Sequence, residues 1–491
     1  MALNTKDSKY NEQFELWRQV RAAIDGKYKV VSELVSCLPG PQYRTMFNYS
    51  GMTKEQQAHA QQCNKFANER VEAYWSRGRF FNATGRTHDS LDGMIWSQEP
   101  ESTIPTRLEY LENNANGAGS GLREVVQKIT DDVISIGRYG VLVDMPQSDT
   151  RPTQAQQESG ELAARFILYK AEQIIYFRVS DQSNAVDEIR LVEVKSVQKN
   201  EFEWEDKVFI RRLVMIDGVY HNQLYTEKDD LISDVTPIAN GSTLTEIPFQ
   251  FFGADNNSPE YSKVPLYDLA NINLGHFVLD CDNRDNLHYH GQGMTNIYTA
   301  LDPEEFAMQN PNGLDVGAKG KNVLGVNDKV EILQIDATGA IASEMLRDEQ
   351  RMIMAGAQLV QDTPTNQTLG AKEMEFGAST STLKRIARNI SSGMVNLLEW
   401  AALFMGVDEE VMYKLNTDFM TDDLSPQMIQ QHFSLVQGGV LPKETIYEVA
   451  RKAGLTKLTD EEIEERASRD ELELPGMTEE QAIAQAVEDG E

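Results

Sequence analysis

The chain has 491 residues, of which 40% are hydrophobic, and its 46 Lys and Arg stand against 77 Asp and Glu, giving a formal net charge of −31. This length and apolar content predict a folded protein of two to four subdomains. Binding to a phosphate backbone requires clustered cations, so the charge argues against a conventional DNA-binding protein. Such acidity suits either plain solubility or a conduit in which DNA slides without adhering.

The sequence predicts no membrane attachment and no disulfide framework. No apolar run reaches the roughly 18 residues of a membrane span, and the first residues lack a signal peptide's basic and apolar regions. Cys37, Cys63 and Cys281 are odd in number and far apart. This spacing favours a reducing compartment such as a host cytoplasm and disfavours a cysteine zinc site.

The first 164 residues predict helices followed by one strand and a loop. The expected helices are a short stripe from Phe14 to Ile24 that ends near Gly26, one opened by a Thr53–Gln56 capping box, a short one within 74–101, and 121–136. Residues 137–146 then form a strand between a Gly stop and a Pro stop, and 147–164 form a polar surface loop.

Residues 165–252 contain a run of strand candidates in which apolar and polar residues alternate. Alternation places one face of a sheet against the core and the other in water. We therefore expect an antiparallel sheet built from hairpins.

The longest apolar periodicity lies in 265–291, between Pro265 and Gly291. One face of the expected helix carries Leu266, Ala270, Leu274, Phe277, Val278 and Cys281, and the other carries Asp268, Asn271, Gly275, Asp282 and Asn286. Ile272 and Leu279 lie beside the polar stripe. This pattern predicts a helix contacted from two directions, either inside an ordinary enzyme domain or between like neighbours. If the neighbours are copies of the chain, the candidate interface residues are Leu274, Phe277, Ile272 and Leu279.

The rest of the chain predicts a Gly-rich insertion between two helices, then a break, a third helix and an acidic end. Residues 292–340 contain short strand-like pieces, and 341–360 form a helix. Pro and Gly interrupt 361–377, a helical stripe runs from Leu383 to Ala401, and 407–491 are expected to be helical, with a capping box at Thr459 and Glu462.

No motif predicts an enzyme. His288 and His290, near Asp282 and Asp285, are two residues apart and would diverge on a helix. The GAKGKN sequence at 317–322 lacks the first Gly and the Ser or Thr of a phosphate loop. We therefore expect no catalytic residues, no metal and no cofactor.

Three cations on the third helix, Lys384, Arg385 and Arg388, fall on one exposed face. They form either a solvated flank paired to nearby carboxylates or a ring of positive charge near a polyanion or a subunit interface.

Five blocks in order, 74–101, 119–146, 247–253, 265–297 and 415–449, resemble the portal proteins of tailed double-stranded DNA phages. The resemblance is to a portal family formerly catalogued as a domain of unknown function. It implies an α+β fold with an α/β wing, a two-helix stem, a small clip and a helical crown, assembled as a ring, usually of twelve subunits. The implied parts are a wing at 1–264, stem helices at 265–291 and 341–360, a clip at 292–340, a channel loop at 361–377, a long helix at 378–406 and a crown at 407–491.

The resemblance also implies a function and partners. The ring would form a channel at one capsid vertex of the virion, assembled in the host cytoplasm, through which double-stranded DNA is packaged and ejected without sequence-specific binding. Its expected protein partners are the major capsid protein, the terminase large subunit and head–tail adaptor or tail proteins. Candidate docking residues in the clip are Lys319, Lys321 and Lys329, and Lys372 joins Lys384, Arg385 and Arg388 as DNA-channel candidates. The alternatives are a metal- or nucleotide-dependent nucleic-acid hydrolase and an acidic protein that mimics DNA.

Overall fold

The computed structural model describes two compact units, Met1–Thr417 and Asp418–Glu491. The described residues are 3–40, 53–146, 163–180, 185–290, 294–298, 329–333, 339–360 and 382–419, with a few single positions beyond them. Lys319, Lys321, Lys372, the channel loop, and most of the predicted clip and crown lie outside these ranges.

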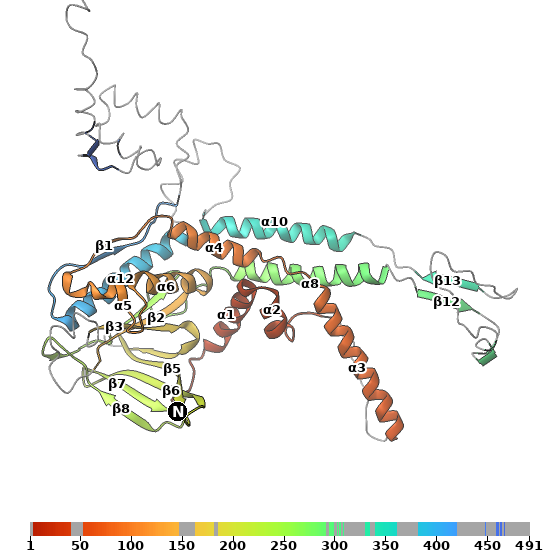
Figure 1. Cartoon of the computed structure of the whole chain (residues 1–491), viewed down its shortest axis with the longest axis horizontal. Coiled ribbons are helices and arrows are strands. Elements are labelled where there is room, and N and C mark those ends of the chain that lie inside the picture. Colours follow the sequence, from red (N-terminus) through yellow and green to blue (C-terminus); the bar gives the residue numbers. More distant parts are fainter. Residues whose placement is uncertain are drawn as a thin grey trace, which may run out of the picture. The chain divides into compact units, whose positions relative to one another are not determined.

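The helices of the first unit (Figure 1) are α1 Tyr10–Asp25, α2 Lys27–Lys29, the π-helix η1 Val30–Leu34, α3 Lys54–Arg77, α4 Ala83–Ile95, the 3₁₀ turns η2 Thr106–Leu108 and η3 Ala171–Gln173, α5 Tyr110–Asn114, α6 Leu122–Ile136, α8 Tyr267–His290, α10 Ala340–Val360 and α12 Thr382–Met405. The predicted helices at 14–24, 121–136, 265–291, 341–360 and 383–401 are confirmed. The capping box predicted at Thr53 and Gln56 opens α3.

The strands are β1 Glu101–Thr103, β2 Arg138–Asp144, β3 Arg165–Lys170, β4 Ile174–Val179, β5 Val186–Gln198, β6 Trp204–Ile216, β7 Val219–Thr226, β8 Leu231–Val235, β9 Ile238–Ala239, β10 Ser242–Thr243, β11 Phe249–Gly253, β12 Met294–Tyr298, β13 Lys329–Leu333 and β14 Met412–Lys414. The predicted α+β class is confirmed.

Two further capping bonds, between Thr459 and Glu462, lie in the second unit as expected.

The predicted antiparallel sheet of 165–252 divides into two main sheets. Strands β4 to β8 form a five-stranded antiparallel sheet in chain order, as expected from the alternation. Strands β3 and β11, at the two ends of that range, instead flank β2 in a separate three-stranded sheet. The expectation of one sheet was therefore wrong, because β2 offers two open edges that the outer strands of the range fill.

The short strand β14 also departs from expectation, because 407–491 was expected to be helical. Met412 to Lys414 pair with Glu101 to Thr103 of β1 in antiparallel register. An ion pair between Lys414 and Glu101, 3.0 Å long, lies at one end of this ribbon. The chain after α12 is thereby tied to the segment after α4.

Helices α6 and α12 cover the three-stranded sheet. The apolar face of α12 packs on β11 and β2, and α6 packs on both α12 and β2. Gly393 of α12 allows the closest approach, since a Cβ there would lie 2.4 Å from the ring of Phe252. This layer forms the base from which α8 departs.

The link between the base and α8 is built around Gly137 and Arg138. Gly137 ends α6 in the left-handed region at φ 75°, and a Cβ on it would lie 2.5 Å from the carbonyl oxygen of Lys263. The buried Arg138 guanidinium donates to the carbonyls of Pro259 and Glu260. It also lies over the rings of Phe177, Phe251 and Tyr261, at 4.5–5.4 Å. Burial lowers the pKa of Arg138 to about 10. The segment that leads into α8 is thus held in place by its contacts with the buried Arg138.

Candidate functional site: a two-helix arm and a basic pocket

Helices α8 and α10 pack side by side and form a two-helix arm (Figure 1). His276 of α8 lies 3.6 Å from the Glu349 carboxylate of α10. Three residues earlier on α8, Asn273 contacts α4, and seven residues later on α10, Gly356 lies against Thr87 of α4. The two helices are therefore antiparallel, and the chain between them includes the β12–β13 hairpin.

One face of α8 is enclosed by its own chain. Leu274, Phe277 and Cys281 are buried in a cluster with Tyr74 and Trp75 of α3, which we name the arm core. The Phe277 ring stacks on Trp75 with the ring centres 5.9 Å apart. The predicted apolar face of this helix is thus confirmed as buried, and Asp268, Asn271, Gly275 and Asn286 of the predicted polar stripe are exposed.

The arm core closes tightly at Gly78, which follows α3. A Cβ at this position would lie 2.2 Å from the Cys281 sulfur and 2.9 Å from the Phe277 ring. Gly78 has φ −58° and ψ 146°, which any residue adopts, so space alone requires glycine here.

Gly78→Ala is therefore expected to destabilise the chain by about 1–3 kcal/mol through overpacking. Cys281→Ala removes the nearest clashing atom, so the double variant should be more stable than the sum of the two single losses predicts. Urea unfolding of the four proteins, followed by circular dichroism, measures this coupling. If the stability losses of the two single variants simply add in the double variant, the close approach of Gly78 to Cys281 is contradicted.

Polar contacts fix the other sides of α8, and sequence analysis singled out neither Asn273 nor Asp280. Asn273 accepts from the backbone N–H and the hydroxyl of Thr84, at 3.1 and 2.9 Å. The Asp280 carboxylate accepts from the backbone N–H of Arg79 at 2.6 Å and from Arg284 at 2.7 Å. Further along, Asp285 pairs with Arg77 and Asp282 accepts from the Tyr74 hydroxyl. Burial and then Asp282 raise the pKa of Tyr74.

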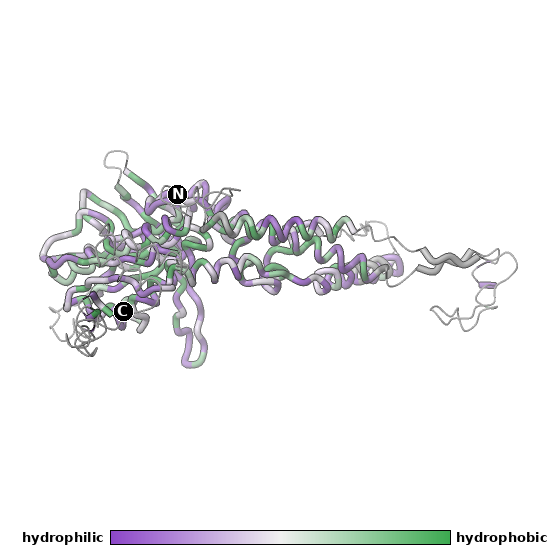
Figure 2. The backbone as a smooth tube through the Cα atoms, turned by 90° about the horizontal axis from the view of Figure 1, so that it is seen from above, coloured by the Kyte–Doolittle hydropathy of each residue, from purple (hydrophilic) through white to green (hydrophobic). Residues whose placement is uncertain are grey.

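The outer side of α10 exposes apolar side chains. Leu346, Ile353 and Met354 are 60%, 73% and 54% exposed, and we name them the outer stripe. Their spacing of seven and eight residues places them on one face, while Met352 is buried. On α8, Ile272 and Leu279 are half-buried, and Gly275 between them has open space around it. Figure 2 shows hydrophobic and hydrophilic residues interspersed along both helices.

The interface candidates thus fall into two groups. Leu274 and Phe277 already contact residues of their own chain, whereas Ile272 and Leu279 retain surface for a neighbour. Contact between copies remains a prediction for all four.

The cations of α12 were expected on one exposed face, but they lie in unlike surroundings, and of the three only Arg388 is exposed. Arg385 donates to the Ala254 carbonyl at 3.2 Å and pairs with Asp255 at 3.1 Å, as in the paired-flank interpretation. Lys384 is half-buried, and Arg388 is exposed. Lys329 lies opposite Tyr298 in the β12–β13 hairpin. Their roles at DNA or at partner proteins remain predictions.

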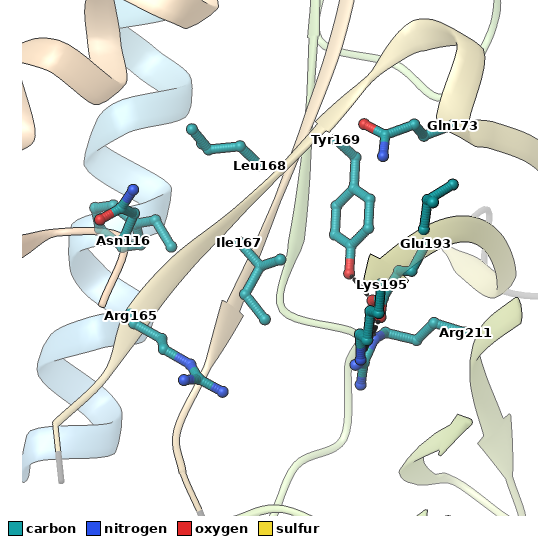
Figure 3. A pocket seen from close by; sticks show the side chains of 11 residues that line it. Asn116, Arg165, Ile167, Leu168, Tyr169, Gln173, Glu193, Lys195 and Arg211 are labelled. Carbon is teal, nitrogen blue, oxygen red and sulfur yellow. Dashed lines mark hydrogen bonds and ion pairs between the residues drawn. The ribbon is translucent and has the colours of Figure 1, made fainter. Parts of the chain in front are cut away.

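A pocket of about 410 Å³ lies between β3 and strands β5 and β6 (Figure 3). Arg165, Ile167 and Tyr169 alternate along one wall, and Glu193, Lys195 and Arg211 line the other. The alternating strand pattern predicted one solvent-facing and one packed face here, but it did not predict that two sheets would bring these charges into one pocket.

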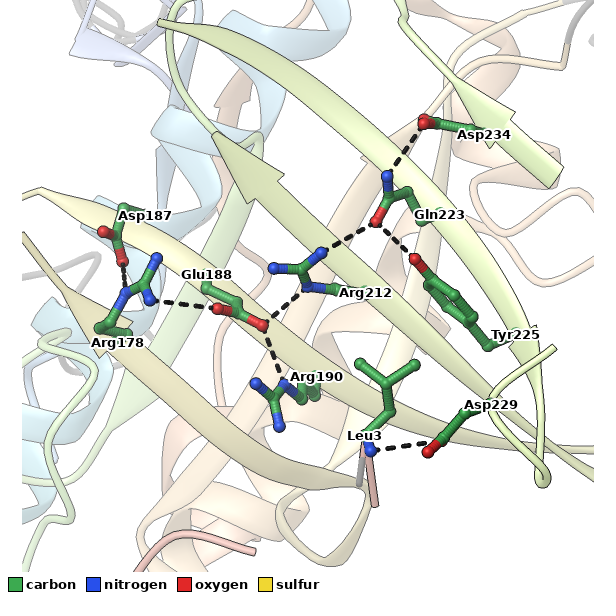
Figure 4. Close-up of polar contacts among 10 residues, drawn as sticks. All are labelled: Leu3, Arg178, Asp187, Glu188, Arg190, Arg212, Gln223, Tyr225, Asp229 and Asp234. Atoms are coloured by element: carbon green, nitrogen blue, oxygen red, sulfur yellow. Dashed lines mark hydrogen bonds and ion pairs between the residues drawn. The ribbon is translucent and has the colours of Figure 1, made fainter. Parts of the chain in front are cut away.

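A second polar network covers the other face of the five-stranded sheet (Figure 4). The buried carboxylate of Glu188 accepts from Arg190 at 2.9 Å and from Arg212 at 2.8 Å, and Arg178 lies 3.5 Å away. Burial alone would raise the pKa of Glu188, but the hydrogen bonds from Arg212 and Arg190 hold it below its usual value. Because these arginines are held by carboxylates of the same sheet, the network stabilises strand pairing.

Within the described ranges, no three His, Cys, Asp or Glu side chains lie close enough together to hold a metal ion. Among the helices that the structure describes, none is long and apolar enough to cross a membrane.

Residues 265–405, from α8 to α12, match the family model described as "Domain of unknown function (DUF4055)". The match confirms the resemblance to a family catalogued as a domain of unknown function, over the part of the chain that contains the two-helix arm. No curated protein matches the chain.

Two solved structures are similar to most of the chain at low identity. A chain from the neck of a native GTA particle, computed with C12 symmetry, is 10% identical with a TM-score of 0.38, over 77% of this chain and 90% of that one. An HK97 family phage portal protein from Corynebacterium diphtheriae is 9% identical with a TM-score of 0.30, over 70% of this chain and 94% of that one.

Proposed function

We propose that the chain is the portal subunit of a tailed phage or a related particle. Copies would form a ring at one vertex of the virion, through which double-stranded DNA enters and leaves. The observation that carries the proposal is the two-helix arm, in which antiparallel α8 and α10 flank an insertion that contains the β12–β13 hairpin. The stem and clip implied by the sequence resemblance require this arrangement.

Two solvent-facing surfaces of the arm, one on α10 and one on α8, support the proposal of a ring. The outer stripe of α10 leaves Leu346, Ile353 and Met354 in water, although burying each would contribute about 1.5–3 kcal/mol. On α8, Gly275 leaves room for a neighbouring helix to approach between Ile272 and Leu279. Contact between α10 of one copy and α8 of the next joins unlike surfaces, and such a contact closes into a ring when the rotation allows. The resemblance implies twelve copies.

The charge of the chain suits passage of DNA. A net charge of −31 on every copy repels phosphate, so DNA would move without adhering to the ring. Arg388 of α12 is exposed, and together with Lys372, Lys384 and Arg385 it is proposed to contact the passing duplex only transiently. The clip, with Lys319, Lys321 and Lys329, is proposed to dock the terminase and later the adaptor, and the wing the major capsid protein.

Purified chain is expected to form closed rings visible in negative-stain class averages, with a particle mass that is an integral multiple of 55.3 kDa. Native mass spectrometry gives the number of copies directly. A protein that remains monomeric at the micromolar concentrations and salt of a packaging reaction would contradict the proposal. Nuclease activity in the same preparation would favour the hydrolase instead.

A further inference from the structure

The pocket between β3 and strands β5 and β6 has more positive than negative charge, in contrast to the chain as a whole. Its lining contains three cations, Arg165, Lys195 and Arg211, and one carboxylate, Glu193. This surplus is local, since the whole chain carries −31. Low-dielectric walls strengthen the field of such a cluster inside a cavity.

Glu193 is already saturated by groups of its own chain. Its oxygens accept from the Tyr169 hydroxyl at 2.6 Å and from Arg211, and Lys195 lies 2.9 Å away. Burial is the largest single influence on the pKa of Glu193 and would raise it, but the hydrogen bonds and charge of Arg211, with the hydrogen bonds from Tyr169 and Lys195, together lower it to about 2. The carboxylate is therefore ionised at neutral pH, and its single charge is shared between two cations.

Arg165 on the facing wall retains hydrogen-bonding capacity. One terminal nitrogen lies 3.1 Å from Asp144, a residue that does not line the pocket. Its Nε is buried and has no hydrogen-bond partner among the residues that the structure describes. The side chain as a whole is 39% exposed, so Arg165 remains accessible to an acceptor from outside the chain.

We propose that this pocket binds an oxyanion group of a small organic molecule, with Arg165 and Lys195 as the anion-contacting residues. Planar guanidinium groups match the oxygen spacing of phosphate and carboxylate, and an ammonium adds a point charge. A cavity of about 410 Å³ is larger than a simple ion requires and falls in the range of small-molecule sites. Ile167 supplies an apolar wall for the body of such a ligand. The proposal is independent of ring formation.

Titration calorimetry of the full chain with inorganic phosphate and, separately, with succinate tests this site at constant ionic strength. Saturable binding of either anion is expected, and the tighter of the two distinguishes a phosphate from a carboxylate ligand. Arg165→Gln and Lys195→Gln should each weaken binding by roughly tenfold or more, because a charge-assisted hydrogen bond is lost. Arg178→Gln is the matched control, since Arg178 pairs with acids on the opposite face of the sheet and should leave binding unchanged.

Three results would overturn the proposal: no saturable binding of either anion, equal affinity in wild type and both pocket variants, or equal weakening in the Arg178→Gln control. Thermal unfolding of each variant shows whether it remains folded, and Lys195→Gln, at a half-exposed side chain, is the variant least prone to disturb folding. Displacement of phosphate by a short DNA duplex would reassign the pocket to a nucleic-acid backbone and reject the small-molecule ligand.

Discussion

Replacing Leu346 with Glu and Ile353 with Asp is expected to leave the chain folded and to abolish ring formation. Both side chains are mostly exposed on α10 and lie two turns apart, so charge there meets water in the monomer. Surface substitutions of this kind usually change the free energy of unfolding by no more than about 0.5 kcal/mol. In a ring, the same positions would bury two unpaired carboxylates in every contact between copies, at a cost of several kcal/mol each.

The measurement is particle mass by native mass spectrometry, alongside the urea midpoint of the isolated subunit. A matched control places the same charges at Leu231 and Ile238, which are similarly exposed on β8 and β9, away from the arm. The control is expected to form rings at the wild-type yield. If the α10 variant also forms them, the outer stripe is not an interface, and another surface holds the copies together.

The local structure of the arm could be predicted from sequence because its signals lie within a few turns of the chain. The three- and four-residue spacing of Leu274, Phe277 and Cys281 identified the buried face of α8, and the Thr53–Gln56 pair identified the start of α3. Gly137 likewise marked the change from helix to strand. In each case the residues that decide the structure are close in sequence, so no tertiary information was needed.

The polar contacts of the arm could not be predicted, because their partners are far away in the chain. Asn273 is buried only because Thr84, 189 residues earlier, lies against it. Which face of α10 is exposed could not be predicted either. Met345, Leu346, Met352, Ile353 and Met354 surround much of the helix, so periodicity alone could not tell which of them α8 covers. The pairing of β1 with β14 joins strands more than three hundred residues apart, and neither carries a strong local signal.

The pocket shows the same limit for function. The alternation of the strands predicts Glu193 and Arg211 at solvent-facing positions, and Arg165 as the first residue of another strand. Only the packing of the three-stranded sheet against the five-stranded one brings these charges into one pocket. A sequence pattern gives the face on which a residue lies, but not the element that covers that face.

Replacing Leu274 and Phe277 together with Asp is expected to unfold the first unit rather than only to prevent ring assembly. Phe277 is fully enclosed and Leu274 nearly so, and both pack in the arm core with Trp75. Truncating Phe277 to Ala alone should cost about 3–5 kcal/mol through lost contacts and the cavity. Two buried carboxylates without partners add several kcal/mol. Combined with the lost contacts and the cavity, this cost exceeds the roughly 5–15 kcal/mol by which a typical domain is stable.

Circular dichroism and the urea midpoint of the monomer measure the effect. The double variant should show no cooperative transition, whereas Asn271→Asp, on the exposed face of the same helix, should unfold at the wild-type midpoint. This difference matters for any test of ring formation, because loss of rings in the core variant would follow from loss of the fold. A Leu274 and Phe277 double variant that is folded, cooperative and monomeric would instead place these side chains at a surface between copies and contradict the arm core described above.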